Sequence, residues 1–197
     1  MQQQDVSYAA GVAYLLVTKE FELKILLVLQ RPGKIHKQSG GTSYRDQRLW
    51  KMPIGKKEAP DNDNLKATAV REFQEETGRV LNREDLRDDL SLRFRIPSNR
   101  PGFKEHEDVF FLVLKGREPE LSGTSLDAEV EIAKFFPITA LPTGDPRISF
   151  GHLIKLVKLI NNARGFLSAS GLNVQEIVWY LKDALNAGQS RFKKPSV

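Results

Sequence analysis

The feature that most constrains the fold is a predicted helix over residues 65–77 of the 197-residue chain. Four apolar residues repeat there at helical spacing, which predicts a face packed against a core: Leu65, Ala69, Val70 and Phe73. Asp63 and Asn64 stand before this run, and the side-chain oxygens of such residues accept the free N–H groups of a helix start. Gly78 follows and can end the helix in a left-handed turn. The pattern and its boundaries therefore indicate one amphipathic helix.

Three glutamates on the other side of this helix are not explained by packing. Glu72, Glu75 and Glu76 lie at i, i+3 and i+4, so their carboxylates share one face and repel one another. Negative charge near the C-terminal end of a helix is also unfavourable. A hard cation removes the conflict, because Mg²⁺ binds oxygen ligands and takes one or two carboxylates plus substrate phosphates. Arg71, four residues before Glu75, can hold that carboxylate in place.

The alternative to a metal site is a solvated acidic helix face, which is common on protein surfaces. That alternative leaves unexplained why an Arg71-Glu72 pair, a terminal glycine and an upstream Pro53-x-Gly55 occur together. We therefore favour a site for a divalent cation on this face of the helix.

Residues 71–78, Arg-Glu-Phe-Gln-Glu-Glu-Thr-Gly, resemble the core of the Nudix box, G-x5-E-x7-R-E-U-x-E-E-x-G-U, in which U is a bulky aliphatic residue. Gly55 resembles the opening glycine of that box. Counting seven residues back from Arg71 assigns the first acid to Asp63 in place of Glu, and seven residues rather than five then separate Gly55 from it. The loop is therefore expected to be expanded by two residues. Arg79 follows Gly78 where the pattern has an aliphatic residue.

The resemblance implies an α/β (α+β) fold, a Nudix-type α/β/α sandwich with a mixed central sheet and an added C-terminal helix. Periodicity alone gives only a mixture of helices and strands. We expect one domain over residues 1–197, with a core at about 6–165 and a C-terminal helical extension at about 166–197. The added helix either closes the core or builds a homodimer surface.

Apolar or alternating runs predict strands over residues 6–18, 25–31, 49–52, 90–96, 109–114 and 129–137. A short helix is expected at 138–141, and amphipathic helices are expected from 149 onward and over 173–188. Long polar loops are expected at 33–48, 97–107 and 115–128.

The resemblance also implies the chemistry. The family hydrolyses a nucleoside diphosphate linked to another moiety, and water attacks phosphorus. By this likeness Glu72, Glu75 and Glu76 hold one or more Mg²⁺ or Mn²⁺ ions, and the backbone carbonyl near Gly55 completes the metal shell. Arg71 is expected to orient Glu75. Asp63 would take the orienting part usually played by a glutamate.

A general base must activate the water, and it is either a glutamate of the box or a carboxylate outside it. Glu129, just before an apolar-aromatic strand, is the first candidate outside the box. Three other acids stand behind it: Glu131, Asp127 and Glu120.

Substrate contacts are predicted from cations and one aromatic residue near the box. Arg31 at a strand end and Arg48 in the polar loop are candidates for phosphate contacts. Trp50 either stacks on a base or fills the core, and the core is favoured because large aromatic residues mostly bury. His106 is expected to be a loop histidine and not a metal ligand, because Mg²⁺ prefers oxygen.

Composition excludes several classes. With 40% hydrophobic and 28% charged residues, the chain is typical of folded soluble proteins. It has no cysteine, which suits a reducing compartment, and its first residues lack the pattern of a signal peptide, so we expect a cytoplasmic protein without a membrane span. The net charge of +5 favours anionic partners. A basic cluster at Arg191, Lys193 and Lys194 is interpreted as a solvated tail, so nucleic acid is not the expected partner.

The function that we predict is metal-dependent hydrolysis of a diphosphate linkage in a nucleoside diphosphate derivative, such as a nucleotide sugar, ADP-ribose or a dinucleoside polyphosphate. The alternative is a non-catalytic Nudix-like module that senses a nucleotide, which fits the expanded loop and Asp63. Retention of Arg71 and all three glutamates argues against that alternative, since unpaired acids cost stability. A nucleic-acid-binding protein would rest on the net charge alone.

Overall fold

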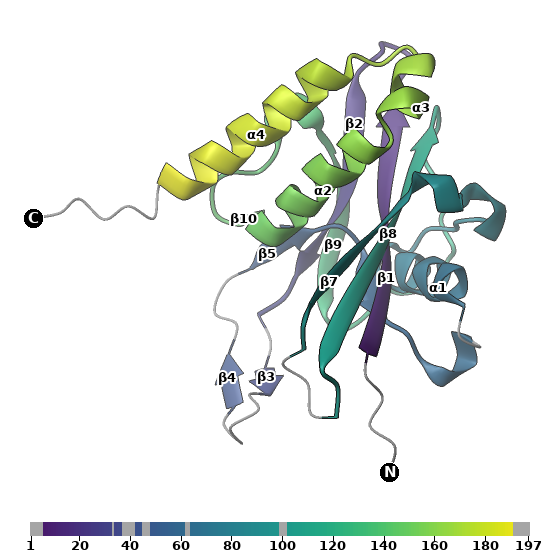
Figure 1. The fold of residues 1–197 in the computed structure, drawn as a ribbon, viewed down its shortest axis with the longest axis vertical. Helices are drawn as coiled ribbons and strands as arrows, with labels where there is room; N and C mark the ends of the chain where they lie inside the picture. Colours follow the sequence, from purple (N-terminus) through teal and green to yellow (C-terminus); the bar gives the residue numbers. More distant parts are fainter. Residues whose placement is uncertain are drawn as a thin grey trace, which may run out of the picture.

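The computed structural model describes residues 6–32, 34–36, 42–44, 48–61, 64–98 and 102–190. Asp63 and the basic cluster at residues 191–194 lie outside these ranges. The described residues form an eight-stranded mixed sheet with helices on both faces, and a separate two-stranded ribbon (Figure 1). The predicted α/β/α sandwich is confirmed.

The sheet is built around two long, apolar strands. Its strands are β1 (Val6–Val17), β2 (Leu23–Gln30), β5 (Leu49–Lys51), β6 (Ile54–Lys56), β7 (Ser91–Pro97), β8 (Glu105–Lys115), β9 (Val130–Pro137) and β10 (Arg147–Ile148). β1 pairs in parallel with β8, and β8 pairs antiparallel with β7. The second half of β1 pairs antiparallel with β2, whereas its first half pairs with β6. β2 continues the sheet to β9 on one side and to β5 and β10 on the other.

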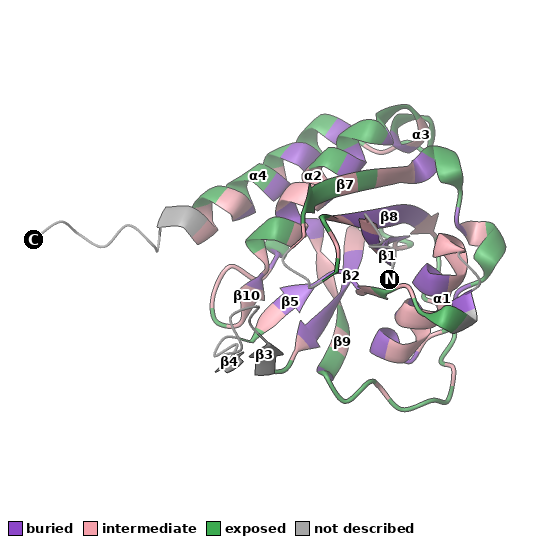
Figure 2. Cartoon of the chain, turned by 60° about the horizontal axis from the view of Figure 1, so that its bottom comes forward, coloured by how far each residue is buried: buried purple, intermediate pink, exposed green. Residues whose placement is uncertain are grey.

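Both faces of the sheet are covered, which explains why β1 and β2 read as nearly continuous apolar runs. Helix α1 (Leu65–Thr77) covers one face, and α2 (Phe150–Asn162) with α4 (Val174–Ser190) covers the other (Figures 1 and 2). A short helix, α3 (Arg164–Ala169), connects α2 to α4. Alternate residues of β1 therefore enter two separate cores: Val12 packs under α1, and Ala13 packs under α2.

The predicted helix over residues 65–77 is confirmed with both of its ends. The Asn64 side chain accepts the backbone N–H groups of Lys66 and Ala67, at 3.0 and 3.2 Å. Gly78 closes the helix in the left-handed region at φ 63°, and its N–H donates to the Gln74 carbonyl at 2.8 Å. These bonds satisfy groups that the helix ends would otherwise leave free.

Three segments differ from the sequence-based expectation. Within the polar loop predicted over residues 33–48, β3 (Lys34–His36) and β4 (Thr42–Tyr44) form an antiparallel ribbon. The loop of the Nudix-like motif, for which no strand was predicted, begins with the short strand β6. The loop predicted at 97–107 ends early, because β8 begins at Glu105. The polar residues at the start of β8 can lie in a strand because Glu107 is paired with Arg93 and Arg95 of the neighbouring strand β7.

The C-terminal helix belongs to the same core as the sheet. Leu181, Ile177 and Ala184 of α4 lie in one hydrophobic cluster with residues of β1, β2 and α2. Closure of the core is therefore part of its role. None of the helices in the described part of the chain combines the length and apolar character that a membrane span requires.

We expect Leu181→Ala to lower the free energy of unfolding by about 2–5 kcal/mol, because a fully buried leucine leaves a cavity when it is truncated. Urea denaturation followed by circular dichroism measures the change. Lys182→Ala, on the exposed side of the same helix, is the matched control and should change stability by less than about 0.5 kcal/mol. Equal effects of the two changes would show that α4 is not part of the cooperative core.

Candidate functional site

One guanidinium group organises the acidic face of α1. Arg71 donates from Nε and Nη2 to the two carboxylate oxygens of Asp61, at 3.1 and 3.0 Å. Its Nη1 donates to Glu72 Oε1 at 2.8 Å and to Glu75 Oε2 at 3.0 Å. Nη2 also donates to the carbonyl of Lys56 at 2.8 Å. A planar fork of donors suits this task, because it can hold several oxygens in fixed positions at once.

Asp61 makes the contacts that the sequence analysis assigned to Asp63. It lies in the 3₁₀ turn Ala59–Asp61 and also accepts from the Thr68 hydroxyl and the Glu58 backbone N–H, both at 2.9 Å. Five residues separate Gly55 from Asp61, which is the box spacing, so the two extra residues fall between Asp61 and α1. Counting forward from Gly55 instead of back from Arg71 would have found this residue.

The charge on Asp61 is stabilised by its surroundings. Burial acts to raise the pKa of the Asp61 carboxyl, but hydrogen bonds from Arg71, Glu58 and Thr68 outweigh it and hold the pKa below its ordinary value. The carboxylate therefore stays ionised, and it ties the start of α1 to the turn that follows β6.

The Glu72 carboxylate packs directly onto the backbone of Gly55. A β-carbon built on Gly55 would lie 1.9 Å from a Glu72 carboxylate oxygen, so only glycine leaves room for this contact. Burial raises the pKa of Glu72 to about 7, against the effect of Arg71 and with help from Glu76 and Glu75. A raised pKa shows a carboxylate whose negative charge is incompletely compensated by the protein.

Glu76 lies deeper than its two neighbours. The Lys51 ammonium donates to Glu76 Oε1 at 2.7 Å, and the Ile54 backbone N–H donates to Oε2 at 2.9 Å. Burial raises the pKa of Glu76, although the Lys51 ammonium acts in the other direction. The sequence analysis expected all three glutamates to hold one or more metal ions, and in the structure Glu76 also has these two partners within the protein. Lys51 was not identified from the sequence, where a single lysine in a strand carries no signal.

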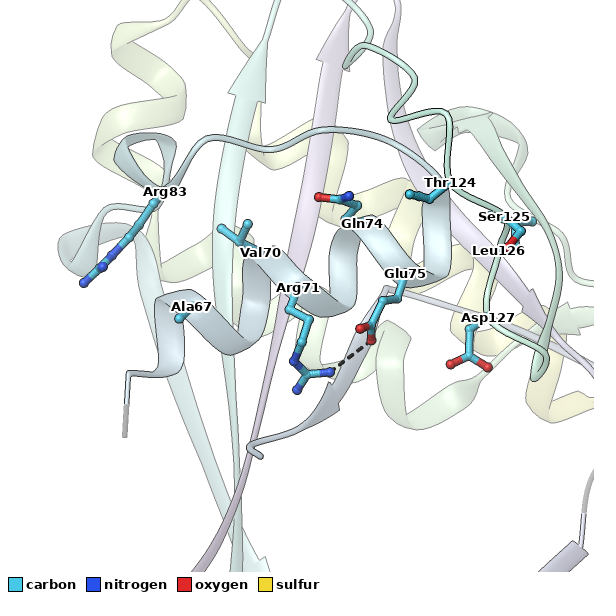
Figure 3. Close-up of a pocket in the computed structure, with 10 residues that line it drawn as sticks. All are labelled: Ala67, Val70, Arg71, Gln74, Glu75, Arg83, Thr124, Ser125, Leu126 and Asp127. Carbon is cyan, nitrogen blue, oxygen red and sulfur yellow. Dashed lines mark hydrogen bonds and ion pairs between the residues drawn. The ribbon is translucent and has the colours of Figure 1, made fainter. Parts of the chain in front are cut away.

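Glu75 is the most exposed of the three glutamates and opens onto a cavity of about 760 Å³ between α1 and residues 124–127. The Asp127 backbone N–H donates to the Glu75 carbonyl at 2.8 Å, which fastens this loop to the helix. In Figure 3 the side chains of Arg71, Glu75 and Asp127 point to the same side of the cavity. Arg83 lines the cavity as a second cation.

The other candidate acids do not line the cavity beside Glu75. Glu129 is exposed, and its carboxylate accepts from Gln30 Nε2 at 3.4 Å. Glu131 forms an ion pair with Arg48. The Glu120 carbonyl accepts from the Val80 N–H at 2.8 Å, shortly after the C-terminal end of α1. Of the four acids proposed outside the box, Asp127 is the one that lines the same cavity as Glu75.

The structure shows the surroundings of Trp50 and Arg31, two of the candidate substrate contacts, and of His106. Trp50 is buried in the core, edge-to-face with Phe136 at 4.6 Å between ring centroids, so core packing accounts for it. Arg31 is exposed at the end of β2, where its N–H donates to the Glu129 carbonyl at 2.8 Å. His106 lies on β8 and not in a loop. Its ring nitrogens form hydrogen bonds with the Ser7 hydroxyl and the Asp108 carboxylate, each at 2.8 Å.

The donor set around Gly55 fits a hard divalent cation. Among the described residues no three histidine or acidic side chains converge closely enough to form a complete protein metal cage. Glu72 and Glu75 nevertheless supply two carboxylates held by the same Arg71 Nη1, and the Glu72 carboxylate lies beside the Gly55 backbone. Mg²⁺ commonly uses one or two carboxylates and leaves its remaining positions to water and substrate phosphates.

The fold and this arrangement support a hydrolase of pyrophosphate bonds. Residues 7–153 match the NUDIX domain, and the chain therefore belongs to the NUDIX family. Comparison with curated protein sequences finds no match.

Solved structures share this fold. A MutT/nudix family protein from Enterococcus faecalis is 16% identical over 94% of this chain and 82% of its own, with a TM-score of 0.55. The NUDIX domain of Shewanella oneidensis NrtR, complexed with ADP ribose, is 20% identical over 83% of this chain and 90% of its own (TM-score 0.53).

A bifunctional NMN adenylyltransferase/ADP ribose pyrophosphatase from Francisella tularensis, complexed with AMP and a manganese ion, is also similar. It is 16% identical over 82% of this chain and 43% of its own, with a TM-score of 0.52. At these identities the likeness of all three proteins shows the fold alone.

We expect Asp61→Asn to lower the free energy of unfolding at pH 7 by about 2–4 kcal/mol, because it leaves Arg71 without its charged partner. The folded-state pKa of Asp61 is lowered, so its contribution is fully present above the unfolded value of about 3.9 and is lost as pH falls through the folded value. The difference between wild type and variant should therefore be constant near neutral pH and shrink below about pH 4.

Urea denaturation over a series of pH values measures this dependence. Asp183→Asn, at an exposed position of α4, is the matched control and should have almost no effect. A stability difference of unchanged size down to about pH 2.5 would contradict the ion-pair assignment of Asp61.

Proposed function

We propose that this chain hydrolyses a diphosphate linkage in a nucleoside diphosphate derivative with the help of Mg²⁺ or Mn²⁺. The observation that carries the proposal is the contact set of Arg71, which draws the Glu72 and Glu75 carboxylates together, with the Glu72 carboxylate against Gly55. Two carboxylates held at one guanidinium nitrogen repel each other. That repulsion is costly unless a further cation binds beside them, alone or together with an anionic ligand.

Glu72, Glu75, Glu76 and the backbone carbonyl of Gly55 are the groups that would hold the metal. A bound divalent ion neutralises phosphate charge and activates water, which is the chemistry that this site would lack without it. The raised pKa of Glu72, caused first by burial, supports the assignment, since a nearby divalent cation would favour its ionised form.

The residues of the chain supply position and a place for a proton. Arg71 fixes the Glu75 carboxylate, and Asp61 fixes Arg71. Asp127, fastened to Glu75 through its backbone, is our choice for the base that accepts a proton from the attacking water, ahead of Glu129 and the box glutamates. Water adds to one phosphorus, the bridging P–O bond breaks, and the leaving phosphate carries away the bridging oxygen.

The cavity beside Glu75 supports a nucleotide-sized substrate. Its volume of about 760 Å³ lies in the range of small-molecule sites, and Arg71 and Arg83 on its wall favour an anion. The Shewanella and Francisella relatives are complexed with ADP ribose and with AMP. We therefore propose a small-molecule nucleotide diphosphate as the substrate, with ADP-ribose the first compound to test, and nucleotide sugars and dinucleoside polyphosphates next.

A panel of these compounds with Mg²⁺ and with Mn²⁺, scored by the products released, tests the proposal. Release of two phosphate monoesters from at least one compound, dependent on the metal, is the expected result. The absence of hydrolysis across the panel would overturn it.

A nucleotide-binding module without catalysis is the second candidate. The engagement of both Glu76 oxygens by Lys51 and Ile54 favours it, because a ligand that is already paired is not free for a metal. Calorimetry separates the two functions: binding of ADP-ribose without turnover assigns the module, and turnover assigns the enzyme.

We expect Glu75→Gln to lower kcat/KM by about 100-fold or more, since loss of a metal-bearing carboxylate removes several kcal/mol of transition-state stabilisation. Because Glu75 is only half-buried, the melting temperature of the variant should stay near that of the wild type. Glu84→Gln, at an exposed acid, is the matched control. Wild-type activity in Glu75→Gln would remove that residue from the site.

We expect Gly55→Ala to lower activity by about tenfold or more while changing the melting temperature little. The added methyl group meets the Glu72 carboxylate, and the end of a flexible side chain can move aside at small cost. That movement displaces Glu72 from its place beside Glu75. Thermal denaturation together with the hydrolysis assay measures both quantities, and a stable variant with full activity would contradict the role of this contact.

A further inference from the structure

The turn between β1 and β2 presents an aromatic residue at a strained backbone position. Phe21 has φ 61°, in the left-handed region that bulky residues rarely adopt, and it is 87% exposed. Its N–H donates to the Thr18 carbonyl at 3.0 Å and closes the turn. Glycine would fit this conformation without strain, so the turn itself does not require phenylalanine. Strained positions cluster at functional sites, and aromatic residues are frequent anchors at protein interfaces.

Phe21 also lines a cavity of about 370 Å³, which we call the hairpin groove. The groove lies where the β1–β2 turn meets the start of α4 (Figure 1). Two exposed acids, Glu22 and Glu176, line it as well. Most of its other side chains are apolar: Val17, Leu23, Ile138, Leu172, Ile177 and Tyr180. An apolar groove with acidic residues beside it is complementary to an aromatic residue flanked by cations.

The chain carries such a segment after α4. Residues 191–194 are Arg-Phe-Lys-Lys, so Phe192 stands among three cations. The protein as a whole carries a net charge of +5, which makes the acids of the hairpin groove a local exception. Charge complementarity therefore favours the 191–194 segment as the occupant of the groove.

This segment is too close to the end of α4 to fill the groove of its own chain. Tyr180 is the groove residue of α4 nearest to that end, and it lies ten residues before Ser190, about 15 Å along the helix. Phe192 lies two residues beyond Ser190, and two extended residues span only about 7 Å. Phe192 can therefore reach a hairpin groove only on a second copy of the chain.

The exposed face of α4 offers the second copy a surface for contact. Trp179 on this face is 60% exposed, and its ring lies 4.9 Å from the ring of Tyr180, edge-to-face. Charges of both signs lie on the same side of the helix, at Glu176, Lys182 and Asp183. If two α4 helices pack antiparallel, the end of each lies beside the start of the other. That arrangement brings each 191–194 segment to the hairpin groove of the other copy.

We propose that two copies of this chain form a dimer through antiparallel α4 helices and exchange their 191–194 segments. Phe192 of each copy binds in the hairpin groove of the other, beside Phe21, and its neighbouring cations face Glu22 and Glu176. Because the two contacts are identical and related by a two-fold axis, association stops at the dimer. The inference does not depend on the proposed hydrolysis.

Sedimentation velocity over a concentration series measures the association. Phe192→Ala and Phe21→Gly should each weaken the dimer about tenfold or more, because each removes an aromatic anchor. Phe21→Gly relieves the strained backbone, so this variant should stay folded, which circular dichroism checks. Leu121→Ala is the matched control: Leu121 is 75% exposed in the segment that pairs with the residue after Gly78, and its loss should leave the dimer unchanged.

A charge exchange tests whether the segments pass between copies. Glu176→Lys and the double variant Lys193→Glu/Lys194→Glu each place like charges together, so each alone should dimerise about tenfold more weakly or worse. An equal mixture of the two proteins pairs every altered groove with an altered segment of opposite charge. The mixture should therefore regain an affinity within about threefold of the wild type.

Three results would overturn the proposal. The first is a wild-type protein that stays monomeric throughout the series. The second is a dimer that Phe192→Ala does not weaken, which would assign the groove to another part of the second copy. The third is a mixture of the two charge variants that dimerises no better than either variant alone.

Discussion

The structure of the site depends on the attraction between Arg71 and three carboxylates. Asp61 comes from the turn after β6, whereas Glu72 and Glu75 come from the helix that follows. One guanidinium group therefore joins a loop to the helix and, at the same time, holds like charges near each other. Because the guanidinium group cannot be deprotonated in proteins, its own positive charge persists over the whole range of physiological pH.

The sheet gives this attraction a fixed base. The first half of β1 pairs with β6, and its second half pairs with β2, which in turn pairs with β5. The segment between β5 and β6 therefore passes the middle of β1, where its partner changes from β6 to β2. α1 then packs across the same face of β1. The residues before Gly55 thus contact both the strands of the sheet and helix α1. The position of Gly55 is therefore set by the fold and not by the site alone.

The sequence predicts those parts of the molecule that are encoded locally. The helix over 65–77 and its caps, the glutamate face, the central strands and the two C-terminal amphipathic helices all follow from spacing and turn chemistry. Gly55 was found because a motif names it. Asp61 was missed because an insertion of two residues can be put on either side of the acid, and only the contact with Arg71 decides which side is correct.

Other features could not be predicted because they join distant residues. Lys51 and Glu76 are separated by 25 positions, and no periodicity links a strand end to the back of a helix. The early start of β8 was hidden by its polar residues, whose partners lie on β7 and α2. The interpretation of Trp50 as a core residue rested on general burial tendencies, and its contact with Phe136 supplies the specific cause.

The place of α4 in the core has a consequence for what counts as the unit of folding. The region that matches the family ends at residue 153, inside the first turns of α2. A chain cut at that point would lose the rest of α2 and all of α4, and the apolar face of the sheet beneath them would meet water. The stretch that matches the family model is therefore shorter than the stretch that folds, and a fragment chosen by family boundaries alone should aggregate.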